Sequence, residues 1–531
     1  MASLTAQQID NLALLGKVWG FLKYHHPMIA QGQYNWDYQL FRLLPRYLIV
    51  SNNQDRDQLL SSWITSVGEV QQCTRCQPTS SVAVLKPDFS WFNKFNLSAS
   101  LTQQLKYLYD NRHQGPQYYI TIGHNVGNPL FVNENSYESM IYPDDGFRLL
   151  ALYRYWNMIH YFFPSKHLTD TQWSGVLTQY ITKFVNAQSA LEYQQSVVEL
   201  LGEINDGHAY TAGVFVFQQW KGQNYPPVEL KFVRGQLVVV GHYKSEFETK
   251  SGLKIGDVIT QINGKNIKEI VTGIQRFYPA SNQATRLSGI SLDMMRSNDK
   301  QLEISYIRDG VAADLILDLY SPEIVGFYSQ FSRDEQGKSF ELLPGNIGYI
   351  NLEHIQASDV DTIKQQLRGT KGAIIDIRNY PRAFVVHTLG RFFTAQPKEF
   401  AKFTVVNINN PGEINFDHHA TLSGELLSYQ NKVIVIINQE TQSMAEYTAM
   451  AFRAGDNTLL IGSTTAGADG NTSRIVLPGG IATAISGIGV YYPDGTQTQR
   501  VGIVPDIEVL PTIAGIKERR DELLEKAINL I

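Results

Sequence analysis

The stretch KVIVIINQETQSMAEYTAMAFRAG, residues 432–455, decides how the second half of this chain folds. Its first part, 432–437, is an apolar run rich in β-branched residues, which is typical of a strand buried on both faces. A short polar turn follows, and the small and apolar residues from Met444 onward fit a helix. Ser443 therefore stands where we expect the helix to begin, among backbone N–H groups that have no partner within the helix.

Strand-like and helix-like segments alternate on both sides of this stretch, from about residue 345 to residue 510. The predicted strands are 345–352, 372–378, 432–439 and 457–464, and the predicted helices are 359–369, 383–393 and 444–455, with an amphipathic helix in the tail at 519–531. This alternation predicts an α/β core in which helices cover a buried sheet.

The segments before this core have a different character. Residues 226–320 contain alternating β-type runs, and the segment SGLKIGDVITQINGKNI at 251–267 places an Asn263-Gly264 hairpin turn between two of them. This segment resembles the core of a PDZ domain, although the region lacks the Gly-Leu-Gly-Phe type of loop that holds peptide carboxylates in many PDZ domains.

The first 212 residues are predicted to be mainly helical, and part of their pattern occurs twice at an offset of 137 residues. The matching pairs are Trp19 and Trp156, Tyr24 and Tyr161, Pro27 and Pro164, and Trp36 and Trp173. We interpret 10–70 and 147–212 as two related helical units produced by duplication. Two unrelated helical hairpins with similar packing needs are the alternative.

These patterns divide the chain into four predicted domains. Residues 1–110 form a helical unit with additional strands, and 111–225 contain the second helical unit. Residues 226–325 form the PDZ-like β domain, and 326–531 form the α/β core with its C-terminal helix. We therefore predict a multidomain α/β protein.

Composition sets limits on partners and location. The net charge of −5 and the absence of a long Lys/Arg run argue against nucleic acid as a partner. No apolar run reaches the roughly 18–20 residues that a membrane helix needs, and the start shows no signal-peptide pattern. The cysteines Cys73 and Cys76 have three possible states: a small disulfide, half of a zinc site, or two free thiols.

Ser443 has two interpretations. It can cap its helix, or it can be a nucleophile whose attack creates an oxyanion near the helix N-terminus. Four segments in order resemble motifs of the C-terminal processing protease family, peptidase family S41: IIDIRNYP at 374–381, SMAE at 443–446, IGSTTAGADGN at 461–471 and YYPDGTQTQRVGIVPDIEV at 491–509. The resemblance implies a ClpP/crotonase-like core, a serine endopeptidase acting on peptides or proteins, and no cofactor. It also implies a cell-envelope or secreted location, with a cytoplasmic one left open.

The resemblance also bears on the base that activates Ser443. In the Ser-Lys branch of the family the base is a lysine, but the matching position here is Ala468. The segment NDGHAY at 205–210 resembles the histidine segment of the tricorn-like branch, which implies that His208 is the base. Histidine suits this role because its ordinary pKa of about 6.5 lies near neutral pH.

The same branch implies the remaining site residues. A glutamate and a serine orient the histidine there, and the matching positions are Gln499 and Gly207. We predict a Ser443–His208–Gln499 relay, with Asp206 and Glu446 as alternative orienting groups. The oxyanion donors are predicted to be the Met444 amide and one amide after Asn379, from Arg382 or Ala383, where the family has glycines.

Two alternatives to a peptidase remain on the same scaffold: a catalytically impaired peptide-binding protein, and a hydrolase of other esters or amides. The substitutions at 207, 382, 383 and 499 motivate the first of these. Asp417-His418-His419 is the strongest metal-like cluster, but we expect a surface loop there and no metal.

Overall fold

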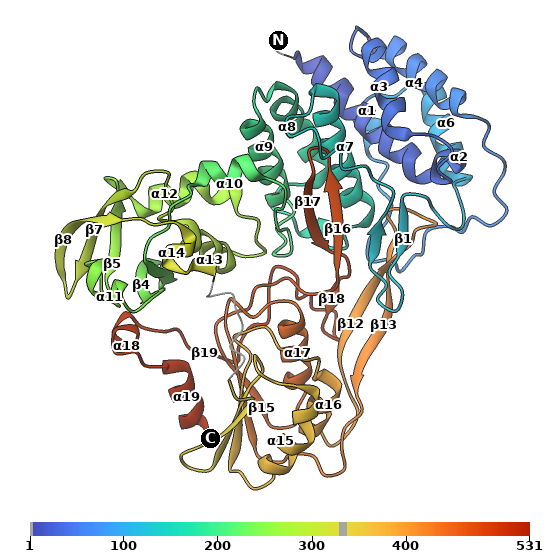
Figure 1. The fold of residues 1–531 in the computed structure, drawn as a ribbon. Coiled ribbons are helices and arrows are strands. Elements are labelled where there is room, and N and C mark those ends of the chain that lie inside the picture. Colours follow the sequence, from blue (N-terminus) through green and yellow to red (C-terminus); the bar gives the residue numbers. More distant parts are fainter. Residues whose placement is uncertain (1–3, 329–336) are drawn as a thin grey trace.

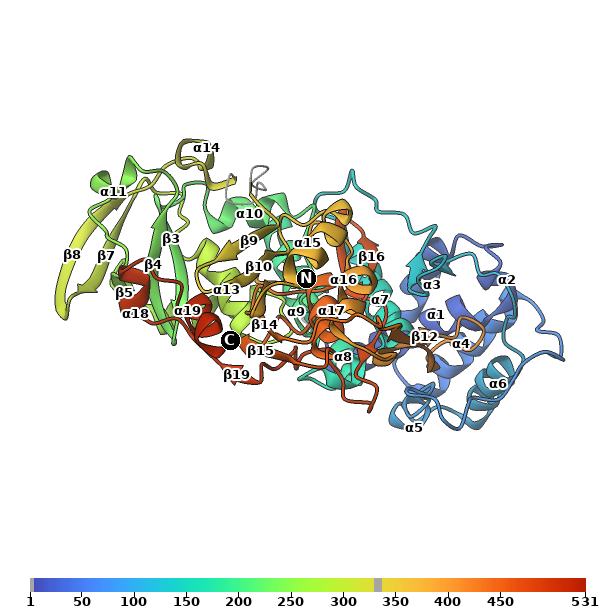
Figure 2. The ribbon, with the colours of Figure 1, turned by 90° about the horizontal axis from the view of Figure 1, so that it is seen from below.

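The structure, a computed structural model, describes residues 4–328 and 337–531. It is a mixed α/β architecture with several sheets (Figure 1). Seen from below, the β domain and the N-terminal helices lie at opposite ends, with the α/β core between them (Figure 2). No helix in the described ranges is long and apolar enough to cross a membrane.

The core is built on a six-stranded sheet in the order β19-β15-β14-β11-β10-β9. Its strands are β9 Phe340–Leu343, β10 Ile347–Asn351, β11 Gly372–Asp376, β14 Lys432–Ile437, β15 Thr458–Gly462 and β19 Ile507–Glu508. All neighbours pair in parallel except β9, which is antiparallel to β10. As expected for parallel strands, the central β11 and β14 are almost completely buried.

Helices cover both faces of this sheet because successive strand residues point to opposite sides. Val433 and Val435 of β14 pack toward α15 Val360–Leu367, α16 Val386–Gly390 and α17 Met444–Arg453. Ile434 and Ile436 face the other way and pack with α19 Glu522–Leu530. The predicted core strands, the helix after Ser443 and the tail helix are therefore confirmed, while helix 383–393 is shorter than predicted and ends in a 3₁₀ turn at Arg391–Phe393.

Two hairpins leave the core and reach the N-terminal region (Figure 1). One consists of β12 Lys398–Val406 and β13 Ile414–Leu422, and β18 Val490–Tyr491 joins its sheet. The other consists of β16 Thr472–Leu477 and β17 Ile481–Ser486, which packs beside the helices. The sequence analysis predicted neither hairpin, and the expected surface loop at 417–419 is an exposed part of β13.

Residues 228–318 form a separate sheet in the order β3-β4-β5-β7-β8, with β6 paired to β5. Its strands are β3 Val228–Val233, β4 Gln236–His242, β5 Val258–Ile262, β6 Lys265–Asn266, β7 Gln301–Arg308 and β8 Val311–Asp318. Three helices lie between these strands in sequence: α11 Phe247–Lys250, α12 Ile267–Ile274 and α13 Gln283–Asp293. The short helices α14 Pro322–Val325 and α18 Ile513–Lys517 lie outside the range 228–318. The domain has its own apolar core, and its PDZ-like character stays a prediction.

The N-terminal region is mainly helical. Its elements are α1 Ala6–His25, α2 Pro27–Ala30, α3 Trp36–Tyr47, α4 Asn53–Val67, α5 Trp91–Lys94, α6 Ala99–Asp110, β1 Ile120–Ile122, β2 Pro129–Phe131, α7 Asp145–Phe162, a 3₁₀ turn at Lys166–Leu168, α8 Trp173–Asn186, α9 Ala190–Gly202 and α10 Phe215–Lys221. Cys73 and Cys76, which precede α5, form a disulfide, one of the three states considered for them.

The two helical units share a reciprocal tryptophan pair. The Trp19 indole N–H donates to the Trp36 carbonyl oxygen (3.2 Å), and the Trp36 indole donates back to Trp19 (2.9 Å). Trp156 and Trp173 exchange the same two bonds at 2.9 and 3.0 Å. The same side chains, 137 residues apart, thus close the same helix–loop–helix unit, which supports the duplication.

We expect the change Trp36→Phe to lower the free energy of unfolding by about 1–2 kcal/mol, because a buried indole donor is lost while the ring is largely kept. Trp173→Phe is expected to have a similar effect in the second unit. Urea denaturation followed by circular dichroism measures both changes. Trp220→Phe, at a half-exposed position (44% exposed), is the control, and an equal response of all three variants would refute the role of the pairs.

Candidate active site

Ser443 lies in a strained turn between β14 and α17. Its backbone has φ 58° and ψ −122°, a combination that favours glycine and costs a serine roughly 1–3 kcal/mol. Such a sharp strand-to-helix turn presents the serine hydroxyl at the end of a sheet, as in the nucleophile elbows of α/β-hydrolases. Ser443 is indeed only partly buried, whereas the helix behind it is mostly buried.

The buried side chain of Glu446 holds this turn in place. Its carboxylate accepts hydrogen bonds from the amides of Ser443 (3.1 Å), Gly467 (2.8 Å) and Ala468 (3.0 Å). The Ser443 amide also donates a hydrogen bond to the Ala468 carbonyl oxygen at 3.0 Å. Burial raises the pKa of Glu446 to about 6, although the hydrogen bonds, including one from Thr465, oppose that rise. Glu446 thus connects the start of α17 to the loop 465–468.

His208 follows α9 in a loop whose conformation Asp206 sets. The Asp206 carboxylate is fully buried and accepts hydrogen bonds from the His208 amide (3.0 Å) and from the amide and hydroxyl of Ser486 (2.6 and 2.9 Å). The Ser486 hydroxyl lies 2.8 Å from His208 Nδ1. Ser486 is the last residue of β17, so a core hairpin positions a histidine that comes from the helical half of the chain.

This chain of contacts fixes the tautomer of neutral His208. A carboxylate only accepts hydrogen bonds, so the single Ser486 hydroxyl proton goes to Asp206. The Ser486 oxygen must then accept from His208, which places the imidazole proton on Nδ1 and leaves Nε2 free to take a proton. Burial lowers the pKa of His208 below its ordinary value, while the negative charge of Asp206 acts in the opposite direction.

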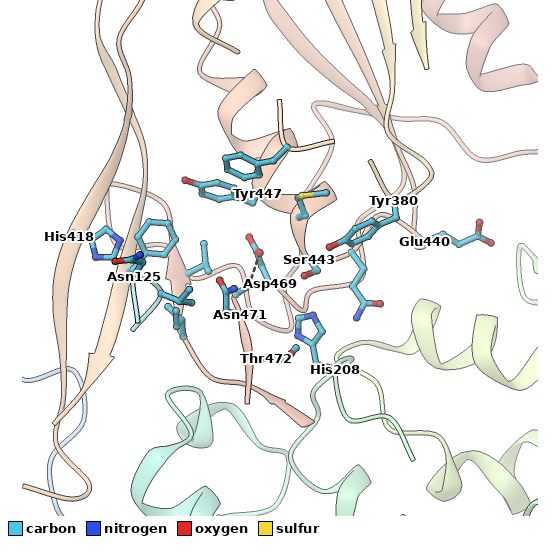
Figure 3. Close-up of a pocket in the computed structure, with 18 residues that line it drawn as sticks. Asn125, His208, Tyr380, His418, Glu440, Ser443, Tyr447, Asp469, Asn471 and Thr472 are labelled. Carbon is cyan, nitrogen blue, oxygen red and sulfur yellow. Dashed lines mark hydrogen bonds between the residues drawn. The ribbon is translucent and has the colours of Figure 1, made fainter. Parts of the chain in front are cut away.

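Ser443 and His208 line the same pocket, which has a volume of about 870 Å³. Figure 3 shows the His208 ring next to the Ser443 side chain. The segments around them are in direct contact, because the side-chain amide of Gln442 donates to the Gly207 carbonyl oxygen at 3.1 Å. Two segments 235 residues apart in sequence are therefore brought together, as the interpretation of His208 as a base requires.

Gln499 has a different place from the one that the predicted relay gives it. The Nδ1 atom of His208 faces Ser486, and Gln499 is not among the residues that line the pocket. The Gln499 side chain is buried, and its Nε2 has no hydrogen-bond partner among the described residues. The groups that contact this side of His208 are instead Ser486, which the sequence analysis missed, and, through Ser486, Asp206, which it named as an alternative orienting group.

Gly207 occupies the position where the resemblance implies a serine. A Cβ atom on Gly207 would lie 3.0 Å from the Cβ of Ala468, closer than ordinary packing allows. A serine there would crowd the loop beside Ser443. The hydroxyl group that contacts the histidine comes instead from Ser486.

The backbone amides predicted as oxyanion donors differ in whether they already donate a hydrogen bond within the protein. The Met444 amide, at the first position of α17, has no acceptor among the described residues, as expected for a helix N-terminus. The Arg382 amide, in contrast, donates to the Leu352 carbonyl oxygen at 2.9 Å, so the prediction that it could supply the second donor is wrong. The Ala383 amide stays the candidate for that position.

Several other groups that the sequence singled out do not form a further centre. His418 pairs with the neighbouring Asp417 (2.9 Å) and His419 pairs with Glu399 (3.0 Å), all on exposed strands. Within the described ranges, no group of three or more His, Cys, Asp or Glu residues is placed to hold a metal ion. His418 does contribute to the pocket that contains Ser443.

Comparison with known proteins gives the class of this chain. Residues 346–509 match the model of peptidase family S41, a span that contains Ser443 and the loop held by Glu446. The α/β core of this chain is therefore similar to peptidase family S41.

Two curated relatives are C-terminal processing proteases. The chain is 22% identical to the carboxy-terminal processing protease CtpA of Bacillus subtilis over 53% of this chain and 55% of that protein. It is 26% identical to the carboxyl-terminal-processing protease of Synechocystis sp. over 35% of this chain and 44% of that protein. The chain thus spans about half the length of the curated relatives that it matches. The solved structure of mature CPAF complexed with lactacystin is similar in fold, with a TM-score of 0.56, 13% identity, and coverage of 73% of this chain and 98% of that one.

We expect Glu446→Gln to lower the free energy of unfolding by about 2–3 kcal/mol, because an amide –NH₂ would face backbone N–H groups that now donate to a carboxylate. Activity at Ser443 is expected to fall with it, since the turn loses its anchor. Glu508→Gln, at an exposed position of β19 in the same sheet, is the matched control. Equal thermal and urea midpoints for both variants would contradict this role of Glu446.

The pH dependence of kcat/KM is expected to have its acidic limb below pH 6.5. Neutral His208 is the active form, and a pKa below the ordinary value keeps it neutral to lower pH. Asp206→Asn removes the charge that raises this pKa, so the limb should move further down, with a rate loss of about 10²–10⁴ from poor orientation.

Ser486→Ala should reduce kcat at every pH by removing the acceptor for Nδ1–H. Ser473→Ala, on the paired strand β16 and equally buried, is the control. An unchanged pH profile and rate in both the Asp206 and the Ser486 variant would exclude the orienting role of this pair.

Proposed function

We propose that this chain is a serine peptidase that uses His208, similar to the tricorn-like branch of family S41, rather than a lysine base. The observation that carries the proposal is the shared pocket: a serine in a strained turn at a helix N-terminus lies beside a histidine whose Nε2 is left free by the Ser486–Asp206 contacts. The match of residues 346–509 to the family and the similarity to C-terminal processing proteases support peptide or protein substrates.

The residues present can perform acyl transfer in two stages. Ser443 Oγ attacks the peptide carbonyl carbon while Nε2 of His208 accepts the hydroxyl proton. The Met444 amide, with Ala383 as the proposed second donor, stabilises the oxyanion. His208 then protonates the leaving amine, and a water molecule activated by the same nitrogen releases the acyl group from Ser443. Asp206, acting through Ser486, stabilises the imidazolium form.

The lysine alternative has no support at the site. The position of the family's catalytic lysine is Ala468, which is completely buried against the histidine loop. A methyl group cannot accept a proton, so only a base from elsewhere in the pocket can serve Ser443.

We also propose an oxidising compartment, at the cell envelope or outside the cell, for this protein. The disulfide between Cys73 and Cys76 supports it, because such bonds persist outside the reducing cytosol. The PDZ-like assignment of residues 226–325 stays part of the proposal, as does its role in binding peptide.

A fluorophosphonate probe tests the nucleophile directly. We expect the native chain to be labelled at Ser443, Ser443→Ala to be unlabelled, and His208→Ala to be labelled about 10²–10⁴ times more slowly. His419→Ala, an exposed histidine on β13, is the control. Equal labelling of the native and Ser443→Ala proteins would sink the proposal. Hydrolysis of an unfolded protein compared with small acyl esters then separates a peptidase from an esterase.

A further inference from the structure

Asp469 is a buried carboxyl group in the pocket that the proposed mechanism does not use. It lines the same pocket as Ser443, although only 5% of its surface is exposed. Its Oδ1 accepts a hydrogen bond from the Gly470 amide (2.6 Å), whereas its Oδ2 is buried with no partner among the described residues. In Figure 3 the carboxyl group points toward the side of the pocket where Tyr447 lies.

The surroundings of this carboxyl group supply no positive charge. Its acidic neighbour Glu446 is itself fully buried. Among the ion pairs of residues 4–328 and 337–531, none joins a lysine or arginine to Asp469 or Glu446. Burial, and secondarily the charge of Glu446, hold the pKa of Asp469 well above its usual range. Both effects favour the protonated form of the Asp469 carboxyl group.

Aromatic rings form the wall beside Asp469. Tyr447 stacks on Phe384 with 6.2 Å between ring centres, and Phe403 lies 5.8 Å from Tyr447 and 4.7 Å from His418. All four side chains line the pocket. Such a wall suits the methylene stem of a long side chain, and aromatic faces attract a cationic head group. An unpaired buried carboxyl group beside it offers a partner for that head group.

We propose that Asp469 makes the pocket selective for substrates with a lysine or arginine at the residue whose carbonyl Ser443 attacks. The aromatic wall holds the stem, and the ammonium or guanidinium group pairs with the Asp469 carboxylate. Binding transfers the Asp469 proton to solvent, so that one proton is released for each cation bound. The inference rests on the proposed function for the reaction itself, but the cation site exists independently of turnover.

Neutral side chains would interact with the Asp469 carboxyl group in a different way from a cation. An apolar side chain would leave the buried Oδ2 unsatisfied. A neutral amide would bond to the protonated acid without releasing a proton. Proton release therefore distinguishes the proposed cation from both of these ligands.

Calorimetry on the Ser443→Ala protein tests the site without catalysis. Benzamidine and its uncharged analogue benzamide are titrated in buffers with different ionisation enthalpies, which gives the number of protons released. We expect benzamidine to bind at least about tenfold more tightly than benzamide, to release close to one proton, and to gain up to about tenfold in affinity per pH unit while Asp469 is protonated.

Asp469→Asn is expected to weaken benzamidine binding at least about tenfold and to abolish proton release. Asp494→Asn, at an exposed position, should change neither quantity. Equal binding of benzamidine and benzamide, or proton release that persists in Asp469→Asn, would overturn the inference.

Peptide substrates provide the second measurement. The ratio of kcat/KM for a lysine substrate to that for its norleucine counterpart should rise with pH in the native enzyme and be flat in Asp469→Asn. Fluorophosphonate labelling of Ser443 without this cation preference refutes the selectivity alone. Benzamidine binding without labelling refutes the proposed hydrolysis and leaves the cation site in place.

Discussion

The buried carboxylate of Asp206 joins two parts of the chain that are 280 residues apart in sequence. It accepts both the amide and the hydroxyl of Ser486 and holds the His208 amide as well. Removing a carboxylate from water is unfavourable unless its oxygens are well satisfied, and here protein donors satisfy them. These hydrogen bonds hold the His208 segment at a defined position against the end of β17. The imidazole beside Ser443, the free Nε2 and the pocket between the two halves all depend on that position.

The strained turn at Ser443 depends on a second buried carboxylate. The backbone of Ser443 is held in a conformation that serine rarely adopts, and the surrounding structure must maintain it. Glu446 does so with hydrogen bonds to one amide at the start of α17 and two amides in the facing loop. The raised pKa of Glu446 shows that its burial is unfavourable for the charged form. The strained backbone of Ser443 and the buried carboxylate of Glu446 both lower the local stability, and together they keep the serine hydroxyl in a fixed position. Such local losses of stability are common at functional sites.

The elements of this arrangement that depend on short-range sequence patterns could be predicted from the sequence. Apolar β-branched runs and the helix after Ser443 have short-range patterns, and the core strands and tail helix were predicted from them. The β16–β17 hairpin was missed, and with it Ser486. The segment IATAIS at 481–486 is buried throughout, and a buried serine at a strand end has no distinctive local signal. Its partners lie 278 and 280 residues away, so only the tertiary fold reveals them. Arg382 failed as an oxyanion donor for a similar reason, because the Leu352 carbonyl that takes its amide comes from another segment.

The loop that carries His208 packs tightly against the residue at position 468. Ala468 stands where the Ser-Lys branch has its lysine, and its Cβ would lie 3.0 Å from a Cβ on Gly207. The loop that carries His208 thus leaves little room for a side chain at position 207, and the Gln442–Gly207 hydrogen bond holds the loop close to the segment of Ser443. A side chain at 207 would push that loop away from Ser443. Glycine at 207 and alanine at 468 therefore allow the close approach of the two segments, which places His208 in the same pocket as Ser443 although the two residues come from opposite halves of the chain.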